Sequence, residues 1–139
     1  MATKIKSELS KKNKYWIDKH RYYELKHFCM QYPEWKRELA SINLVRRGTL
    51  SESGSIKTNH NESPVEKYIE KSIYYTERID IVERTAKMTD EFLGKYILQA
   101  VTEGYSYEEI KSKLEIPCCR EVYYKMYRRF FWILDRERC

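Results

Sequence analysis

Glycine and proline are scarce in this chain, and long apolar runs are absent from it. The 139 residues include only four Gly and three Pro, too few turn-forming residues for the many short strands of a β-sandwich or barrel. No stretch approaches the roughly 18 consecutive apolar residues that a membrane span needs. The first twelve residues, MATKIKSELSKK, lack the apolar centre of a secretion signal. We therefore expect an all-α cytoplasmic protein that makes no membrane contact.

The patterns of metal sites and of catalysis are also missing. No C-x-x-C pair is formed by the four cysteines, which are Cys29, Cys118, Cys119 and Cys139. His20 and His27 share a face of the first predicted helix, a spacing more typical of surface or packing residues than of metal ligands. The chain contains no glycine-rich phosphate loop and no nucleophile paired with a base. We predict no metal, no cofactor and no enzymatic activity.

Positive charge is present in excess and is unevenly distributed. The formal net charge is +6, with 12 basic and 5 acidic residues in the segment 1–47 and 6 basic and 3 acidic residues in the segment 120–139. The segment between them is net acidic. Two basic ends around an acidic middle indicate a polyanion-binding surface, although a solvated charged face is the commoner meaning of a charge run.

The apolar spacing divides the chain into four parts. Residues 1–14 are polar and rich in lysine, which predicts a flexible basic arm. In the segment 15–47, apolar residues recur three and four apart on both sides of Pro33, which predicts two helices in a hairpin. Residues 48–63 are rich in Gly, Ser, Thr and Asn and predict a linker. Residues 64–139 contain a long helix followed by a helix-turn-helix unit.

The long helix has a clear start signal. Ser63 is a candidate N-cap, Pro64 suits the first helical position, and Glu66 is placed to complete a capping box. The apolar repeat continues to about Lys87, which corresponds to a length of more than about 30 Å. A helix of this length either mediates dimerisation or packs along the domain that follows it.

Three shorter helices are predicted to follow the long one. Thr89 is a candidate cap for a helix that ends at Gly104 and buries Phe92 on its apolar stripe. Ser106 and Glu109 form a second capping-box pattern, which opens a short helix over 106–114. After a turn that contains Pro117, a basic helix runs from about Arg120 to Leu134. This arrangement predicts a helix-turn-helix whose last helix reads the major groove of DNA.

The last helix divides into an apolar face and a basic face. Arg120 and Tyr124, at its beginning, are expected to meet base edges, because Arg can grip guanine with two hydrogen bonds. Lys125, Arg128 and Arg129 are expected to contact phosphates. The alternative is that this helix packs on its own domain and its charges are only solvated.

The N-terminal arm and the tyrosines complete the candidate DNA surface. Lys11, Lys12 and Lys14 cluster in the arm and are expected to steady the bound DNA. Most of the thirteen tyrosines lie on predicted inward stripes. Only Tyr124 is expected to act as a contact residue.

The C-terminal half resembles a family of small phage proteins. The segments GYSYEEI (104–110), LEIPC (114–118), Tyr123-Tyr124 and RRFFWIL (128–134) are similar to the C-terminal end of phage and prophage regulators of the RinA and ArpU type. Cys119 stands where those proteins commonly have glycine. The resemblance covers roughly residues 65–138 and implies a helix-turn-helix like region 4 of a sigma factor, DNA binding and transcriptional activation in a mobile element.

Taken together, these patterns predict a DNA-binding transcriptional regulator of a phage or integrated element. Its expected partners are double-stranded DNA, a second copy in a homodimer, and RNA polymerase or a recombinase. An alternative with the same fold is a recombination directionality factor or a small terminase-like packaging factor. An alternative of another class is a protein-binding module that modulates a host factor such as RNA polymerase or a sigma factor.

Overall fold

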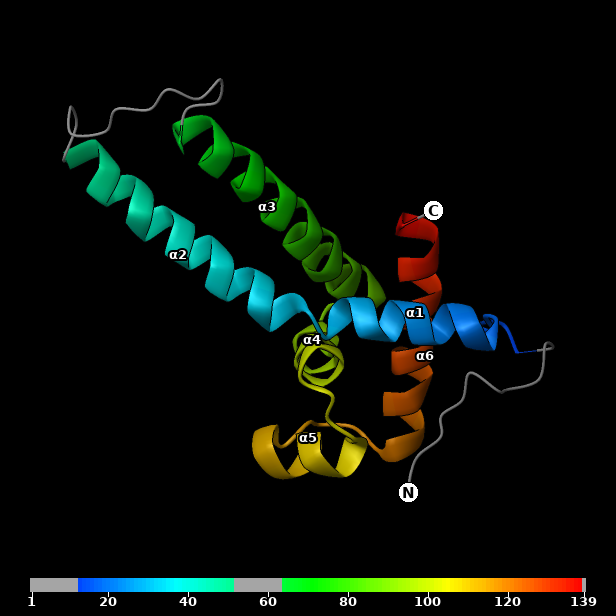
Figure 1. The fold of residues 1–139 in the computed structure, drawn as a ribbon. Helices are drawn as coiled ribbons and strands as arrows, with labels where there is room; N and C mark the ends of the chain where they lie inside the picture. The colour runs from blue at the N-terminus through cyan, green and yellow to red at the C-terminus, as the bar shows by residue number, and fades with distance from the viewer. Residues whose placement is uncertain (1–12, 52–63, 139) are drawn as a thin grey trace.

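The expected all-α class is confirmed. A computed structural model describes residues 13–51 and 64–138, which contain helices and turns but no strand (Figure 1). The helices are α1 (Lys19–Cys29), α2 (Tyr32–Ser51), α3 (Pro64–Thr89), α4 (Gly94–Glu103), α5 (Tyr107–Leu114) and α6 (Arg120–Glu137). No helix in these two segments is long and apolar enough to cross a bilayer.

Helices α2 and α3 run side by side and form an arm that projects from the body built by α1, α4, α5 and α6 (Figure 1). At the base of the arm, the Tyr32 hydroxyl donates to Glu83 Oε2 over 2.5 Å, and Lys36 Nζ lies 3.8 Å from the same oxygen. The side chains of Trp35 and Ile42 on α2 are buried. The arm is therefore an antiparallel pair joined through residues 52–63, which lie outside the described chain.

The two helices expected in the segment 15–47 are present, but α2 packs along α3 and not back along α1. A ring contact between Phe28 and Trp35, with centroids 4.9 Å apart, joins α1 to the first turn of α2. Beyond this contact the two helices diverge (Figure 1). The physical reason is that the apolar stripe of α2 is matched by α3, while α1 uses its own stripe against α6.

The prediction for the start of α4 was wrong. Thr89 is the last residue of α3, and its hydroxyl donates to the Thr85 carbonyl over 2.8 Å. Asp90 holds the following turn instead, because its Oδ2 accepts from the backbone N–H groups of Phe92 and Leu93 at 2.9 and 2.8 Å. This turn directs Phe92 outward, where it is 77% exposed, and not into the core as expected.

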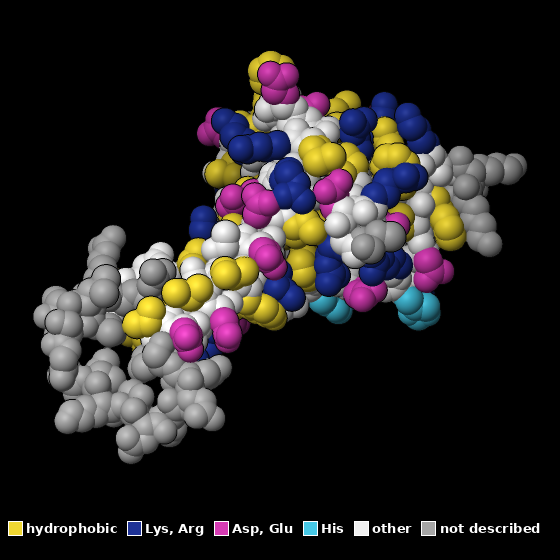
Figure 2. Space-filling view, turned by 90° about the horizontal axis from the view of Figure 1, so that it is seen from above, with side chains coloured by type: hydrophobic (Ala, Val, Ile, Leu, Met, Phe, Trp, Pro, Cys, Tyr) yellow, Lys and Arg dark blue, Asp and Glu magenta, His cyan; other side chains and the backbone are white. Residues whose placement is uncertain are grey.

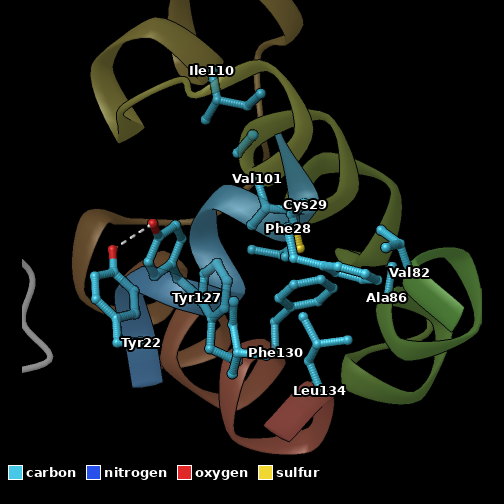
Figure 3. Close-up of a cluster of buried hydrophobic side chains, with 14 of the residues drawn as sticks. Tyr22, Phe28, Cys29, Val82, Ala86, Val101, Ile110, Tyr127, Phe130 and Leu134 are labelled. Atoms are coloured by element: carbon cyan, nitrogen blue, oxygen red, sulfur yellow. Dashed lines mark hydrogen bonds between the residues drawn. The ribbon is translucent and has the colours of Figure 1, made fainter. Parts of the chain in front are cut away.

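A single core joins the two halves of the sequence. Figure 3 shows side chains from α1, α3, α4, α5 and α6 meeting at its centre. The fully buried members include Leu25, Cys29, Val82, Ile97, Ile110, Tyr123, Phe130, Phe131 and Leu134. At the surface of this core, Arg21 on α1 pairs with Asp135 on α6 over 2.5 Å, and this hydrogen bond is the main reason why the pKa of Arg21 is raised.

Candidate nucleic-acid interface

The turn before α5 follows the sequence closely. Gly104 ends α4 in the left-handed conformation at φ 76°, which glycine adopts without strain. Ser106 then caps α5, and Ser106 and Glu109 exchange the two hydrogen bonds of a capping box. Both helix boundaries that the sequence predicted here are confirmed, because each depends on residues within one turn of the chain.

The turn between α5 and α6 is held by Tyr107. Its hydroxyl donates to the Cys118 carbonyl over 2.7 Å, and its backbone N–H donates to the Tyr124 hydroxyl over 3.3 Å. One residue thus fixes both the end of the turn and the first turn of α6. The candidate reading helix is set at a defined angle to α5 by these two bonds.

Cys119 does not need to be glycine in this turn. It precedes α6 as the N-cap with φ −82° and ψ 170°, an extended conformation that any residue adopts. The left-handed position is Glu115, at φ 55°. The departure from the family pattern at Cys119 therefore introduces no backbone strain.

Arg120 lies at the start of α6 and is paired within the protein. Its guanidinium forms an ion pair with Glu108 of α5 and stacks 5.3 Å from the centre of the Tyr124 ring. Backbone hydrogen bonding at the start of α5, together with Arg120, lowers the pKa of Glu108. Because the side chains of both ion-pair partners are more than half exposed, water screens the pair and it is weak. Arg120 can exchange Glu108 for another acceptor.

Tyr124 is packed into the protein to a degree that the sequence did not predict. Its ring contacts those of Tyr107, Tyr123 and Tyr127, with centroid distances of 6.5, 4.8 and 5.9 Å. The side chain is half-buried, and its hydroxyl accepts from the backbone of α5. Tyr124 is therefore part of the aromatic packing that sets the position of α6.

The three other predicted contact residues of α6 differ in exposure. Lys125 is exposed, whereas Arg128 is half-buried and burial lowers the pKa of its guanidinium. Arg129 is also half-buried and donates from Nη1 to the Tyr15 hydroxyl over 3.3 Å. Its Nε is buried without a hydrogen-bond partner. Of these three residues, Lys125 and Arg128 are thus the ones more available to bind a ligand.

The structure brings the N-terminal segment onto the basic face of α6. Tyr15 packs edge-on against Trp132 with ring centroids 5.4 Å apart, and Lys14 Nζ lies 5.4 Å from the Tyr15 ring. The Arg136 guanidinium also contacts Trp132, 3.9 Å from the centre of its ring. Lys11 and Lys12 lie outside the described residues. We call the set Lys14, Tyr15, Lys125, Arg128, Arg129, Trp132 and Arg136 the α6 basic face.

The sequence did not predict that Tyr15 and Arg136 belong to this face. The apolar spacing of α6 puts Trp132 on the outer side of the helix, and an outward tryptophan in a basic helix is a signal that another segment covers it. The contact between Tyr15 and Trp132 joins residues 117 positions apart, so no local spacing could identify it. The two basic ends of the sequence meet at this contact.

The described part of the chain offers no metal centre. No group of three or more His, Cys, Asp or Glu side chains lies close enough to hold an ion there. Cys29 is buried and burial raises the pKa of its thiol, while His20 and His27 are exposed. Cys29, the cysteine nearest to these two histidines in the sequence, thus lies in the core while the histidines lie at the surface.

Comparisons of the chain with protein-family models, with curated proteins and with solved structures found no significant match.

Proposed function

We propose that this chain is a sequence-specific DNA-binding transcriptional regulator of a phage or integrated element, with α6 as the helix that enters the major groove. The observation that carries the proposal is the α6 basic face. Lys14 from the N-terminal segment lies over the ring of Tyr15, and Tyr15 contacts Arg129 and Trp132 of the helix that also carries Lys125, Arg128 and Arg136. A cationic face on the last helix of a capped helix-turn-helix suits the phosphates of a duplex.

The proposed roles differ among the five α6 candidates. Lys125 and Arg128 contact phosphates, and Arg120 leaves its weak ion pair with Glu108 to bind a base edge. Tyr124 and Arg129 position α6, because the Tyr124 hydroxyl and Arg129 Nη1 already form hydrogen bonds within the protein. Lys11, Lys12 and Lys14 extend the phosphate contact along the N-terminal segment.

The test measures the binding of a labelled duplex of random sequence by fluorescence anisotropy at several salt concentrations. Each phosphate contact contributes a slope of about −0.9 to log K against log salt. The variant Lys125→Ala/Arg128→Ala should therefore bind more weakly and lose about 1.8 from this slope. Lys71→Ala, at an exposed position on the arm, is the control and should bind like the wild type.

Sequence selectivity needs a second measurement. Selection of binding sites from a randomised duplex pool should return a common motif for the wild type, and Arg120→Ala should relax it at one or two positions, each worth about 1 to 3 kcal/mol. Two results would contradict the proposal that α6 reads the base sequence. One is wild-type binding without any salt dependence, and the other is a motif selected by Arg120→Ala that is identical to the motif of the wild type. A role in excision or packaging keeps the same DNA contacts and is distinguished by the genes that adjoin the selected site.

One observation favours a second candidate function, a protein-binding module. Phe92 projects from the turn before α4 beside an open groove of about 570 Å³ that is lined by Ala86, Gly94 and Leu98. A rigidly held exposed aromatic next to a groove is typical of a protein contact. This candidate expects no DNA binding at moderate salt, together with binding to purified RNA polymerase that Phe92→Ala abolishes.

A further inference from the structure

Exposed apolar side chains line one face of the first half of α3. None of the residues 65–78 is buried, in contrast to Ile79, Val82, Thr85, Ala86 and Thr89 further along the helix. Val65, Ile69 and Ile73 are 41, 41 and 52% exposed and lie four residues apart, so they share one face of the helix. Figure 2 shows hydrophobic side chains in a row along the arm. We call Val65, Ile69 and Ile73 the α3 stripe.

The α3 stripe lies on a face without charge over three turns. The neighbouring positions on this face are Ser72 and Thr76, while acidic residues flank it at positions 66, 70 and 77. An uncharged seam with charged flanks is the pattern of a helix that packs against another helix. A helix that only projects into water gains nothing from three β-branched residues, which are weaker helix formers than Ala, Lys or Glu.

The segment that joins α2 to α3 offers little to cover the stripe. Residues 52–63 contain a single large apolar side chain, Ile56, among Ser, Asn, Thr and charged residues. The body of the protein covers α3 only from Ile79 onward, where α4 and α6 pack against it. The described part of the chain therefore supplies no cover for the stripe.

We propose that a second copy of this chain covers the α3 stripe, so that two arms pack together as a four-helix bundle. An isologous contact suits the stripe, because each copy then offers the other the same uncharged seam. The free part of the arm, residues 65–78 of α3, is 14 residues or about 21 Å long, and two helices of about 10 Å diameter make it about 20 Å wide. Such a face gives about 840 Å² for both copies, which is below the size of stable specific interfaces. The dimer is therefore expected to dissociate on dilution.

This inference does not depend on DNA binding. Sedimentation velocity of the full chain from about 5 to about 200 μM should show a monomer that converts to a dimer. The variant Ile69→Lys/Ile73→Lys places two charges in the seam and should remain a monomer throughout. Leu114→Lys is the matched control: Leu114 is 41% exposed on α5, outside the arm, and its variant should dimerise like the wild type.

A second measurement keeps the proposal testable if the double variant fails to fold. Hydrogen exchange of the wild type at the two ends of the same concentration range should show slower exchange for residues 65–78 at high concentration, and equal exchange for α5. A wild type that stays monomeric, a dimeric double variant with native circular dichroism, or a Leu114→Lys variant that is equally monomeric overturns the assignment to this face.

Discussion

The hydroxyls of Tyr22 and Tyr127 lie 2.9 Å apart in the buried interior and form a hydrogen bond between α1 and α6 (Figure 3). The two residues are 105 positions apart in the sequence. Phe131 packs edge-on against Tyr22 beside this bond, with centroids 5.2 Å apart. The pair ties the N-terminal helix to the candidate DNA-binding unit.

Removing both hydroxyls of this pair should cost less than the sum of the costs of removing each one alone. Tyr22→Phe leaves the buried Tyr127 hydroxyl without its partner, which should lower the free energy of unfolding by about 1 to 3 kcal/mol. Tyr22→Phe/Tyr127→Phe removes both polar groups, so its loss should be smaller than the sum of the two single losses. Urea unfolding followed by circular dichroism measures all four proteins. Strictly additive losses would mean that the two hydroxyls are not coupled.

Stability should fall in alkaline solution. Burial raises the pKa of Tyr127 well above the ordinary value of 10.0, and burial raises that of Tyr123 as well. Above about pH 10 the unfolded chain therefore loses phenolic protons that the folded chain keeps, and by linkage the free energy of unfolding declines as pH rises. Below that pH both phenols are protonated in the folded and in the unfolded chain, so the free energy of unfolding does not decline on their account. Tyrosinate absorbance at 295 nm should show two or more tyrosines that ionise only with unfolding, and a single smooth titration of all thirteen would contradict this.

Gly94 is where α4 approaches α3 most closely. A Cβ at this position would lie 2.5 Å from the Ala86 carbonyl oxygen, which is backbone and cannot rotate away. Gly94→Ala should therefore destabilise the protein by about 1 to 3 kcal/mol, although alanine favours helix. Lys95→Ala, at the next and exposed position, is the control and should change stability little. A Gly94→Ala protein at least as stable as the wild type would show that the two helices separate at little cost.

The thiols should differ sharply in reactivity. Cys29 is fully buried and burial raises the pKa of its thiol, so it should react with a chromogenic disulfide only when the protein unfolds. Cys119 is exposed and should react at once. In a Cys139→Ser background, urea should accelerate the slow phase, and Cys29→Ser should remove that phase alone. Rapid reaction of Cys29 in the native protein would mean that α1 opens readily from the core.

Local features of the fold could be predicted from neighbouring residues. Ser106 and Glu109 form the capping box that their spacing indicates, Gly104 ends α4, and Pro64 is the first residue of α3. Each feature depends on hydrogen bonds or backbone angles within one turn of helix. The same reasoning did not predict the start of α4. The free N–H groups of that turn donate to the carboxylate of Asp90 and not to Thr89.

The candidate site could be predicted only in part. Lys125 and Arg128 lie on the outer side of α6 as the apolar spacing indicated. Tyr124 and Arg129 share that side of the helix but are held by Tyr107 and Tyr15, which belong to other segments. How many basic side chains of α6 remain free to bind DNA therefore depends on contacts with other segments, which helix periodicity does not predict.

The sequence by itself determined the all-α class, the boundaries of α5 and the start of α3, because propensity, capping and apolar period act over a few residues. Only the tertiary structure decided that α2 pairs with α3, that one core unites both halves, and that Lys14 joins the basic face of α6. These relationships depend on which apolar surfaces exclude water together. That choice is made among all the helices of the chain at once, so no single segment encodes it.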